Sequence, residues 1–105
     1  MGAPESSKQK DEIREFFVYP NPVRGGNAKA RFEIGNNAKT VTLEIYDITG
    51  YCVYQQKMSG VEAGRNQFEN LDLKALGSDV YTVRLQVKFS SGKTKQKLYR
   101  IGVVR

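Results

Sequence analysis

Histidine is absent from the sequence, and cysteine occurs only once, as Cys52. Without an imidazole the chain has no histidine base, no histidine metal ligand and no serine–histidine or cysteine–histidine nucleophile pair. One thiol builds neither a zinc site nor an internal disulfide, and a lone cysteine within a strand is most often a small buried hydrophobe. The acidic residues are scattered singly, without the spacing of a calcium loop or a carboxylate pair. We therefore expect a protein that is not an enzyme and that uses no metal and no cofactor.

Long hydrophobic runs are also absent. No run approaches the ~18 consecutive apolar residues of a membrane helix, and no signal peptide opens the chain, so we expect no membrane insertion. The length of 105 residues and the hydrophobic fraction of 39% suit one small globular domain, which we expect to be a monomer. If the domain works outside the cytoplasm, its export signal belongs to a longer precursor.

Acidic residues are missing from the last part of the chain, where none follows Asp79. Basic residues continue there, and Lys93, Lys95 and Lys97 are spaced by two, so on an extended strand they project from one face. Together with Arg100 they are candidate partner-binding residues for an anionic surface, an acidic glycan or nucleic acid. We favour the alternative of a solvated strand edge whose lysines discourage aggregation, and expect no nucleic acid partner.

The first fifteen residues have little apolar content. We assign residues 1–15 to a flexible N-terminal tail or linker and residues 16–105 to the folded domain. Met1 to Ser6 also fits the short pattern for N-myristoylation, although a start codon fused to a linker explains it as well.

From Phe16 onward the hydrophobic period is two, which indicates β-strands with one buried face. The run 28–34 and the run 41–46 alternate in this way, and Gly35-Asn36-Asn37 between them predicts a hairpin turn. The next turn is predicted at Asp47–Gly50, as a type I turn that leads into a bulge and places Gly50 at positive φ.

Four further strands and one helical turn complete the pattern. After the turn, residues 51–58 form a strand with Val53 as the expected core contact, and a strand around Phe68 follows a polar loop. The spacing of the leucines in residues 71–77 predicts a single helical turn that fills the core, and two long strands after it are joined by a turn at residues 90–93. Seven short strands with turns every 8–12 residues are typical of an all-β, antiparallel immunoglobulin-like sandwich, with a small closed barrel as the alternative.

Two of the three prolines stand directly behind the first apolar run, as Pro20 and Pro22. Proline has no amide donor and a fixed φ, so neither residue belongs inside a paired central strand. The preceding residues, Tyr19 and Asn21, are pushed into extended conformations. The segment therefore indicates an edge strand that is made to leave its sheet.

The motifs of this chain resemble, in their order, the C-terminal immunoglobulin-like domains of secreted bacterial proteins. These are type IX secretion C-terminal sorting domains and the related flagellar hook-cap-type immunoglobulin-like domains. The residues that carry the resemblance over residues 16–105 are Tyr19, Pro20, Asn21 and Pro22, then Asp47 with Gly50, then Val80 and Tyr81, and Lys97 with Leu98. One position departs from the pattern, because Asp79 stands where the family has glycine before Val-Tyr.

This resemblance implies a non-catalytic C-terminal module of a longer exported protein, secreted or held at the cell surface, with a role in sorting or surface anchoring. Type IX domains are recognised by an outer-membrane translocon and are then commonly removed. The implied partner is therefore a protein, either the secretion or anchoring machinery or the other domains of the parent. A passive structural spacer, an adhesion sandwich and a glycan-binding module are the alternatives.

Overall fold

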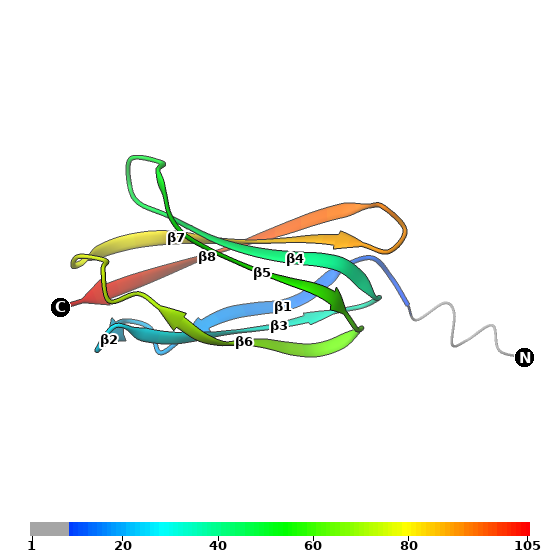
Figure 1. The fold of residues 1–105 in the computed structure, drawn as a ribbon, viewed down its shortest axis with the longest axis horizontal. Coiled ribbons are helices and arrows are strands. Elements are labelled where there is room, and N and C mark those ends of the chain that lie inside the picture. The colour runs from blue at the N-terminus through cyan, green and yellow to red at the C-terminus, as the bar shows by residue number, and fades with distance from the viewer. Residues whose placement is uncertain (1–8) are drawn as a thin grey trace, which may run out of the picture.

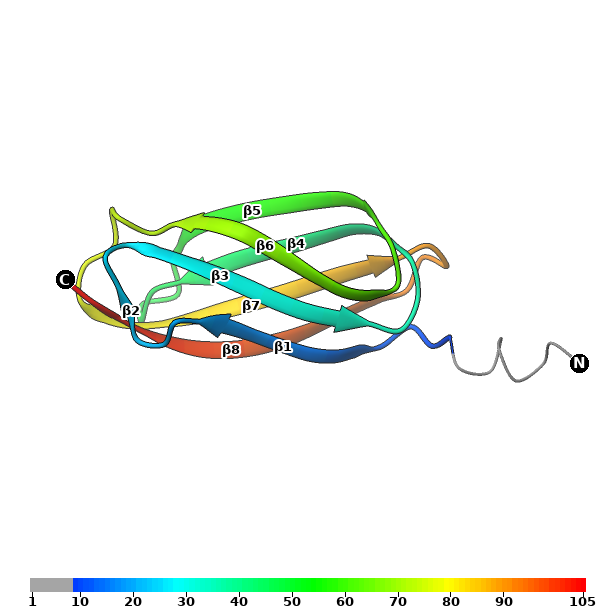
Figure 2. The same cartoon turned by 90° about the horizontal axis from the view of Figure 1, so that it is seen from below.

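The computed structural model describes residues 9–105, and this part of the chain folds into two packed β-sheets (Figures 1 and 2). Its strands are β1 (Ile13–Tyr19), β2 (Val23–Arg24), β3 (Asn27–Ile34), β4 (Ala38–Tyr46), β5 (Cys52–Val61), β6 (Gly64–Asp72), β7 (Asp79–Phe89) and β8 (Thr94–Val104). No helix in residues 9–105 has the length and apolar character needed to cross a membrane. The N-myristoylation pattern at Met1–Ser6 lies outside the described residues.

The two sheets have three and five strands. The smaller has the order β1-β3-β6 and the larger the order β2-β8-β7-β4-β5. All pairs are antiparallel except the short pair of β2 with β8. This division is that of an immunoglobulin-type sandwich, so the predicted all-β fold is confirmed. Residues 9–105 hold eight strands rather than the predicted seven, because β2 forms a short strand of its own.

The proline segment moves the chain from one sheet to the other, as predicted. Strand β1 lies at the edge of the three-stranded sheet and ends at Tyr19. The peptide bonds before Pro20 and Pro22 are both cis. Beyond them Val23 is fully buried and pairs with Val103 of β8, in the five-stranded sheet.

The core lies between the sheets and is filled by every second residue of most strands. In β7 the buried residues are Tyr81, Val83, Leu85, Val87 and Phe89, as the alternation predicts. The rings of Phe32 and Phe68 meet at 5.8 Å between centroids on the inner face of the three-stranded sheet. Burying a side chain of this size stabilises the fold by roughly 1.5–3 kcal/mol.

A tyrosine at the start of β7 fixes the corner between β6 and β7. The Tyr81 ring is buried, and its hydroxyl donates a hydrogen bond of 2.8 Å to the carbonyl oxygen of Gly77, four residues upstream. This arrangement corresponds to the tyrosine corner of immunoglobulin-like sandwiches. It gives Tyr81 of the Val-Tyr motif a structural role.

Two predicted connections have a different form. The Gly35–Asn37 segment is not a hairpin turn, because it joins β3 of one sheet to β4 of the other. The leucine segment is not a helical turn, because Leu71 is paired within β6 and only Leu76 N to Leu73 O closes a turn, at 3.1 Å. The three leucines at positions 71, 73 and 76 are nevertheless buried in the core, as predicted.

The predictions for the start of β5 were wrong. Val53 is 38% exposed, and Cys52 is exposed as well. Tyr46 pairs with Cys52 and Ile45 with Tyr54, so Val53 is the extra residue of a β-bulge. The bulge shifts the alternation and places Tyr54 against the core in its stead.

Candidate functional site

Three motifs that are far apart in the sequence meet at one end of the sandwich. This motif end comprises the Tyr19–Pro22 segment, the Asp47–Gly50 turn between β4 and β5, and the start of β7 at Val80 and Tyr81, beside the last residues of β8 (Figure 1). The register supports this placement, because Val80 is opposite Gly102 and Asn21 bonds to β8. The structure therefore brings together the predicted motif residues.

Asn21 joins the proline segment to β8 through its side chain. The amide nitrogen donates to the carbonyl oxygen of Arg100 at 3.1 Å, and the amide oxygen accepts from the backbone nitrogen of Gly102 at 2.9 Å. The side chain therefore substitutes for a strand residue on β8, just before the point where β2 begins to pair. Neither flanking proline could supply the donor, because proline has no amide hydrogen.

Tyr19 is held on the outer face of the three-stranded sheet. Its hydroxyl donates to Gln67 Oε1 at 2.7 Å, and the Arg31 guanidinium lies 5.8 Å from the centre of its ring. The same guanidinium lies 5.9 Å from the ring of Phe17. These contacts fix the start of the proline segment relative to the sheet.

The Asp47–Gly50 turn is closed by the Asp47 carboxylate. Oδ1 accepts from Thr49 Oγ1 at 2.6 Å, from Thr49 N at 2.9 Å and from Tyr51 N at 3.0 Å. The hydrogen bond from Thr49, with those from the backbone, holds the pKa of Asp47 below its usual value. Gly50 N donates to Asp47 O at 3.0 Å and Gly50 has a φ of +94°, which confirms the prediction for this residue.

A shallow depression lies between this turn and the outer face of the five-stranded sheet. Its lining residues are Tyr46, Asp47, Ile48, Gly50, Val80, Thr82 and Arg100. Apolar side chains are supplied by Ile48 and Val80, and a cation by Arg100. The described residues hold no group of three histidine, cysteine, aspartate or glutamate side chains that could bind a metal ion. Apolar side chains beside a cation are typical of a surface that contacts a protein partner.

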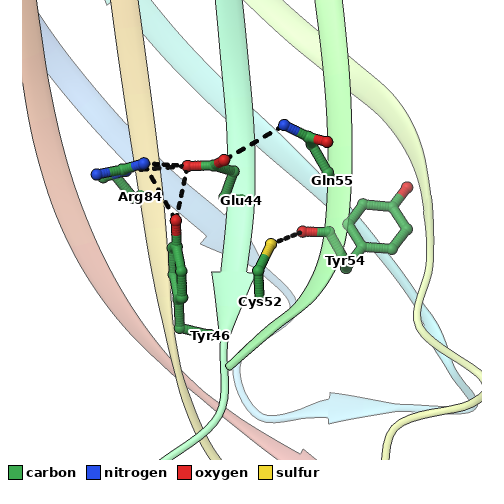
Figure 3. Close-up of polar contacts among 6 residues, drawn as sticks. All are labelled: Glu44, Tyr46, Cys52, Tyr54, Gln55 and Arg84. Atoms are coloured by element: carbon green, nitrogen blue, oxygen red, sulfur yellow. Dashed lines mark hydrogen bonds and ion pairs between the residues drawn. The ribbon is translucent and has the colours of Figure 1, made fainter. Parts of the chain in front are cut away.

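One wall of the depression is supported by a polar network that sequence reasoning did not find (Figure 3). The Arg84 guanidinium donates to Glu44 Oε1, through Nε at 3.0 Å and also through Nη2, and Tyr46 donates to the same oxygen at 2.9 Å. The hydrogen bond from Arg84 holds the pKa of Glu44 below its usual value, and the bond to Glu44 raises the pKa of Tyr46. Only the register, which sets Glu44 opposite Arg84, would have revealed this network.

The three candidate lysines lie at the opposite end, at and beyond the β7–β8 turn. Lys93 precedes the strand, and Lys95 and Lys97 share one side of β8, as expected. That side is the inner one, because it continues to Tyr99, which packs on the core, and to Ile101, which is buried. Of the four candidate partner-binding residues, the structure places only Arg100 at the motif end.

Comparison with known proteins gives a family and a fold. No curated protein matches the chain. A solved structure described as "The crystal structure of CopC from Methylosinus trichosporium OB3b" is similar with a TM-score of 0.54 and 18% identity, over 86% of this chain and 94% of that chain. At this identity the likeness supports the sandwich fold alone. Residues 17–99 match the family described as "Secretion system C-terminal sorting domain". The chain therefore belongs to the secretion system C-terminal sorting domains, a family defined by sorting rather than by a catalytic activity, whose members are parts of exported proteins.

Proposed function

We propose that this domain is a non-catalytic module that sorts its parent protein through a type IX-like pathway to the cell surface or the medium. The observation that carries the proposal is the assembly of the Tyr19–Pro22, Asp47–Gly50 and Val80-Tyr81 motifs at one end of the sandwich. The turn and Val80 line the depression with Ile48 and Arg100, while the proline segment is tied to the same end of β8 through Asn21.

The position of the N-terminal segment supports the same role. Ser91 of the β7–β8 turn donates a hydrogen bond of 2.6 Å to Asp11, so residues 9–12, directly before β1, lie at the end opposite the motifs (Figure 2). A parent domain joined through this segment would attach far from the motif end. The secretion machinery could then contact the motif end while the cargo is still attached.

The motif end offers recognition through a rigid shape. Asn21 ties the proline segment to β8, the Asp47 carboxylate closes the turn, and the Tyr81 hydroxyl fixes the corner before β7. A surface held in this way loses little conformational freedom when a protein partner binds, and this favours binding.

The test is export of a reporter in a type IX-competent bacterium. A periplasmic reporter would carry the whole chain at its C-terminus, and its distribution among periplasm, cell surface and medium would be measured. We expect surface or medium location, which should be lost in a strain without the translocon. The reporter without the domain is the second control. Retention of the fusion in the periplasm would reject sorting and favour a passive spacer.

A further inference from the structure

The outer face of the five-stranded sheet carries the exposed apolar side chains of this domain. In residues 9–105, six large hydrophobic residues are exposed, and all lie on this face or on the β4–β5 turn: Ile48, Tyr51, Val53, Val80, Leu98 and Val104. Three of them are more than half exposed, namely Ile48 at 72%, Tyr51 at 74% and Leu98 at 60%. Exposed hydrophobic side chains that gather on one face mark an interaction surface.

The same face is basic. Five cations occupy its outward strand positions, Arg24, Lys57, Arg84, Lys88 and Arg100, against one carboxylate, Glu44, which is already paired with Arg84. The β4–β5 turn adds the carboxylate of Asp47, which accepts hydrogen bonds within the turn. Within the described residues, the other four cations form no salt bridge.

The outer face of the three-stranded sheet provides a contrast. Its outward strand positions hold three basic residues, Lys29, Arg31 and Arg65, and four acidic residues, Glu15, Glu33, Glu69 and Asp72. Lys29 pairs with Glu69 at 3.5 Å and Arg65 with Glu33 at 3.9 Å. None of the exposed large hydrophobic residues of the described chain lies on it.

We propose that the outer face of the five-stranded sheet, together with the β4–β5 turn, docks on an acidic protein surface that also offers apolar contacts. The inference rests on the proposed function, because the protein that offers this acidic surface would be a component of the secretion machinery. Apolar anchors surrounded by charged residues are the usual composition of a protein interface. Because charges across protein interfaces are arranged to be complementary, the four cations without a salt bridge favour a partner with negative charge.

The distribution of the apolar residues favours a protein over a lipid surface. Val53 lies on β5 and Leu98 on β8, so three strand spacings, about 14 Å, separate them across the sheet. Because a sheet is twisted, side chains spread in this way cannot all enter one flat lipid plane. Uncharged polar residues such as Gln86 and Thr82 lie between them and can hydrogen-bond to a protein.

The reporter fusion also tests this inference. Ile48→Ser combined with Leu98→Ser removes two exposed anchors, and Arg100→Lys, Arg100→Gln and Arg100→Glu form a charge series. Arg65→Glu, at an exposed position on the opposite face, is the matched control for charge. Each purified variant is checked for an unchanged thermal midpoint. Binding to vesicles of 30% phosphatidylglycerol in phosphatidylcholine is measured in parallel.

We expect the double serine variant and Arg100→Glu to lower the exported fraction about tenfold, as loss of an interface anchor would. Export should fall in the order Lys, Gln, Glu at position 100, while Arg65→Glu is exported normally. Normal export of the double variant and of Arg100→Glu would overturn this docking surface and leave the sorting function standing. An original fusion that stays in the periplasm would overturn both. Vesicle binding that is lost in the double variant would replace the protein partner with a membrane.

Discussion

Replacement of Gly50 by alanine isolates the energetic cost of the backbone conformation in the Asp47–Gly50 turn. Gly50 has a φ of +94°, in the left-handed region, and an added Cβ would meet no atom within 4 Å. Gly77 is a matched control, because its Cβ would also point into open space and its φ lies outside that region. The two substitutions therefore differ in backbone strain and not in steric contact.

The expected magnitude follows from two opposing effects. Alanine in place of glycine stiffens the unfolded chain, which stabilises a protein by about 0.4–1 kcal/mol where the native backbone suits alanine. At a left-handed position alanine also costs roughly 1–2 kcal/mol of strain. The first effect is shared, so the free energy of unfolding of Gly50→Ala should lie about 1–2 kcal/mol below that of Gly77→Ala.

Urea denaturation followed by far-ultraviolet circular dichroism measures this difference, since the protein has no tryptophan. Gly50→Val should be less stable again, because a β-branched side chain fits a positive φ poorly. If Gly50→Ala and Gly77→Ala unfold at the same urea concentration, the turn does not depend on the left-handed residue and the reasoning fails.

Two further changes test the polar contacts of the site. Asn21→Ala removes both hydrogen bonds to β8 and should lower the free energy of unfolding by about 1–2 kcal/mol in the same urea assay. Asn21→Asp keeps only an acceptor, so its free energy of unfolding should lie between those of Asn21→Ala and the original protein. An Asn21→Ala variant as stable as the original protein would contradict this. Glu44→Gln tests the Arg84 pair: because the folded pKa of Glu44 is lowered from 4.5, the carboxylate stabilises the fold above 4.5 and its contribution is lost as pH falls through the folded pKa. The stability gap between the protein and Glu44→Gln should thus be largest near neutral pH and close in acid, and a gap that widens in acid would refute the assignment.

Alternation of apolar residues predicted the faces of the strands wherever one face is buried. β7 shows this clearly, because it lies inside the sheet between β8 and β4 and its odd-numbered residues from Tyr81 to Phe89 are all buried. β5 is an edge strand, and Val53 and Tyr54 are both apolar, so the pattern there does not select a face. The bulge between Ile45 and Tyr46 of the pairing turns Tyr54 inward and leaves Val53 exposed, and no residue type in the sequence indicates a bulge there.

Turn chemistry predicts where the chain bends but not which strand it meets next. Gly35-Asn36-Asn37 and Asp47–Gly50 both contain typical turn residues, yet only the second joins paired strands. Likewise the prolines predicted a chain that leaves its sheet, whereas the bonds from Asn21 to Arg100 and Gly102 depend on pairing across some eighty positions. The motif end is therefore a product of topology, which a resemblance in motif order can suggest but local pattern cannot derive.

Lys95 and Lys97 give the final test, because the sequence predicts that they protect a strand edge from aggregation. They occupy the inner side of β8 where β2 no longer covers its edge, since β2 pairs only with Val103 and Val104. Along Thr94–Tyr99 no described strand pairs with that edge, so its backbone could accept a strand of another molecule. A charge that points inward opposes this, because an added strand would bury it.

Replacing both lysines with valine should therefore promote self-association while the fold persists. We expect the double variant to elute as a dimer or larger species in size-exclusion chromatography with light scattering, increasingly so at higher concentration, and Lys93→Val, outside the strand, to elute as the original protein does. Lys→Gln at both positions should change the free energy of unfolding by less than about 0.5 kcal/mol, as for ordinary surface changes. If the molar mass of the double valine variant equals that of the original protein at every concentration, these lysines do not protect the edge. Partner binding would then be the better explanation for them.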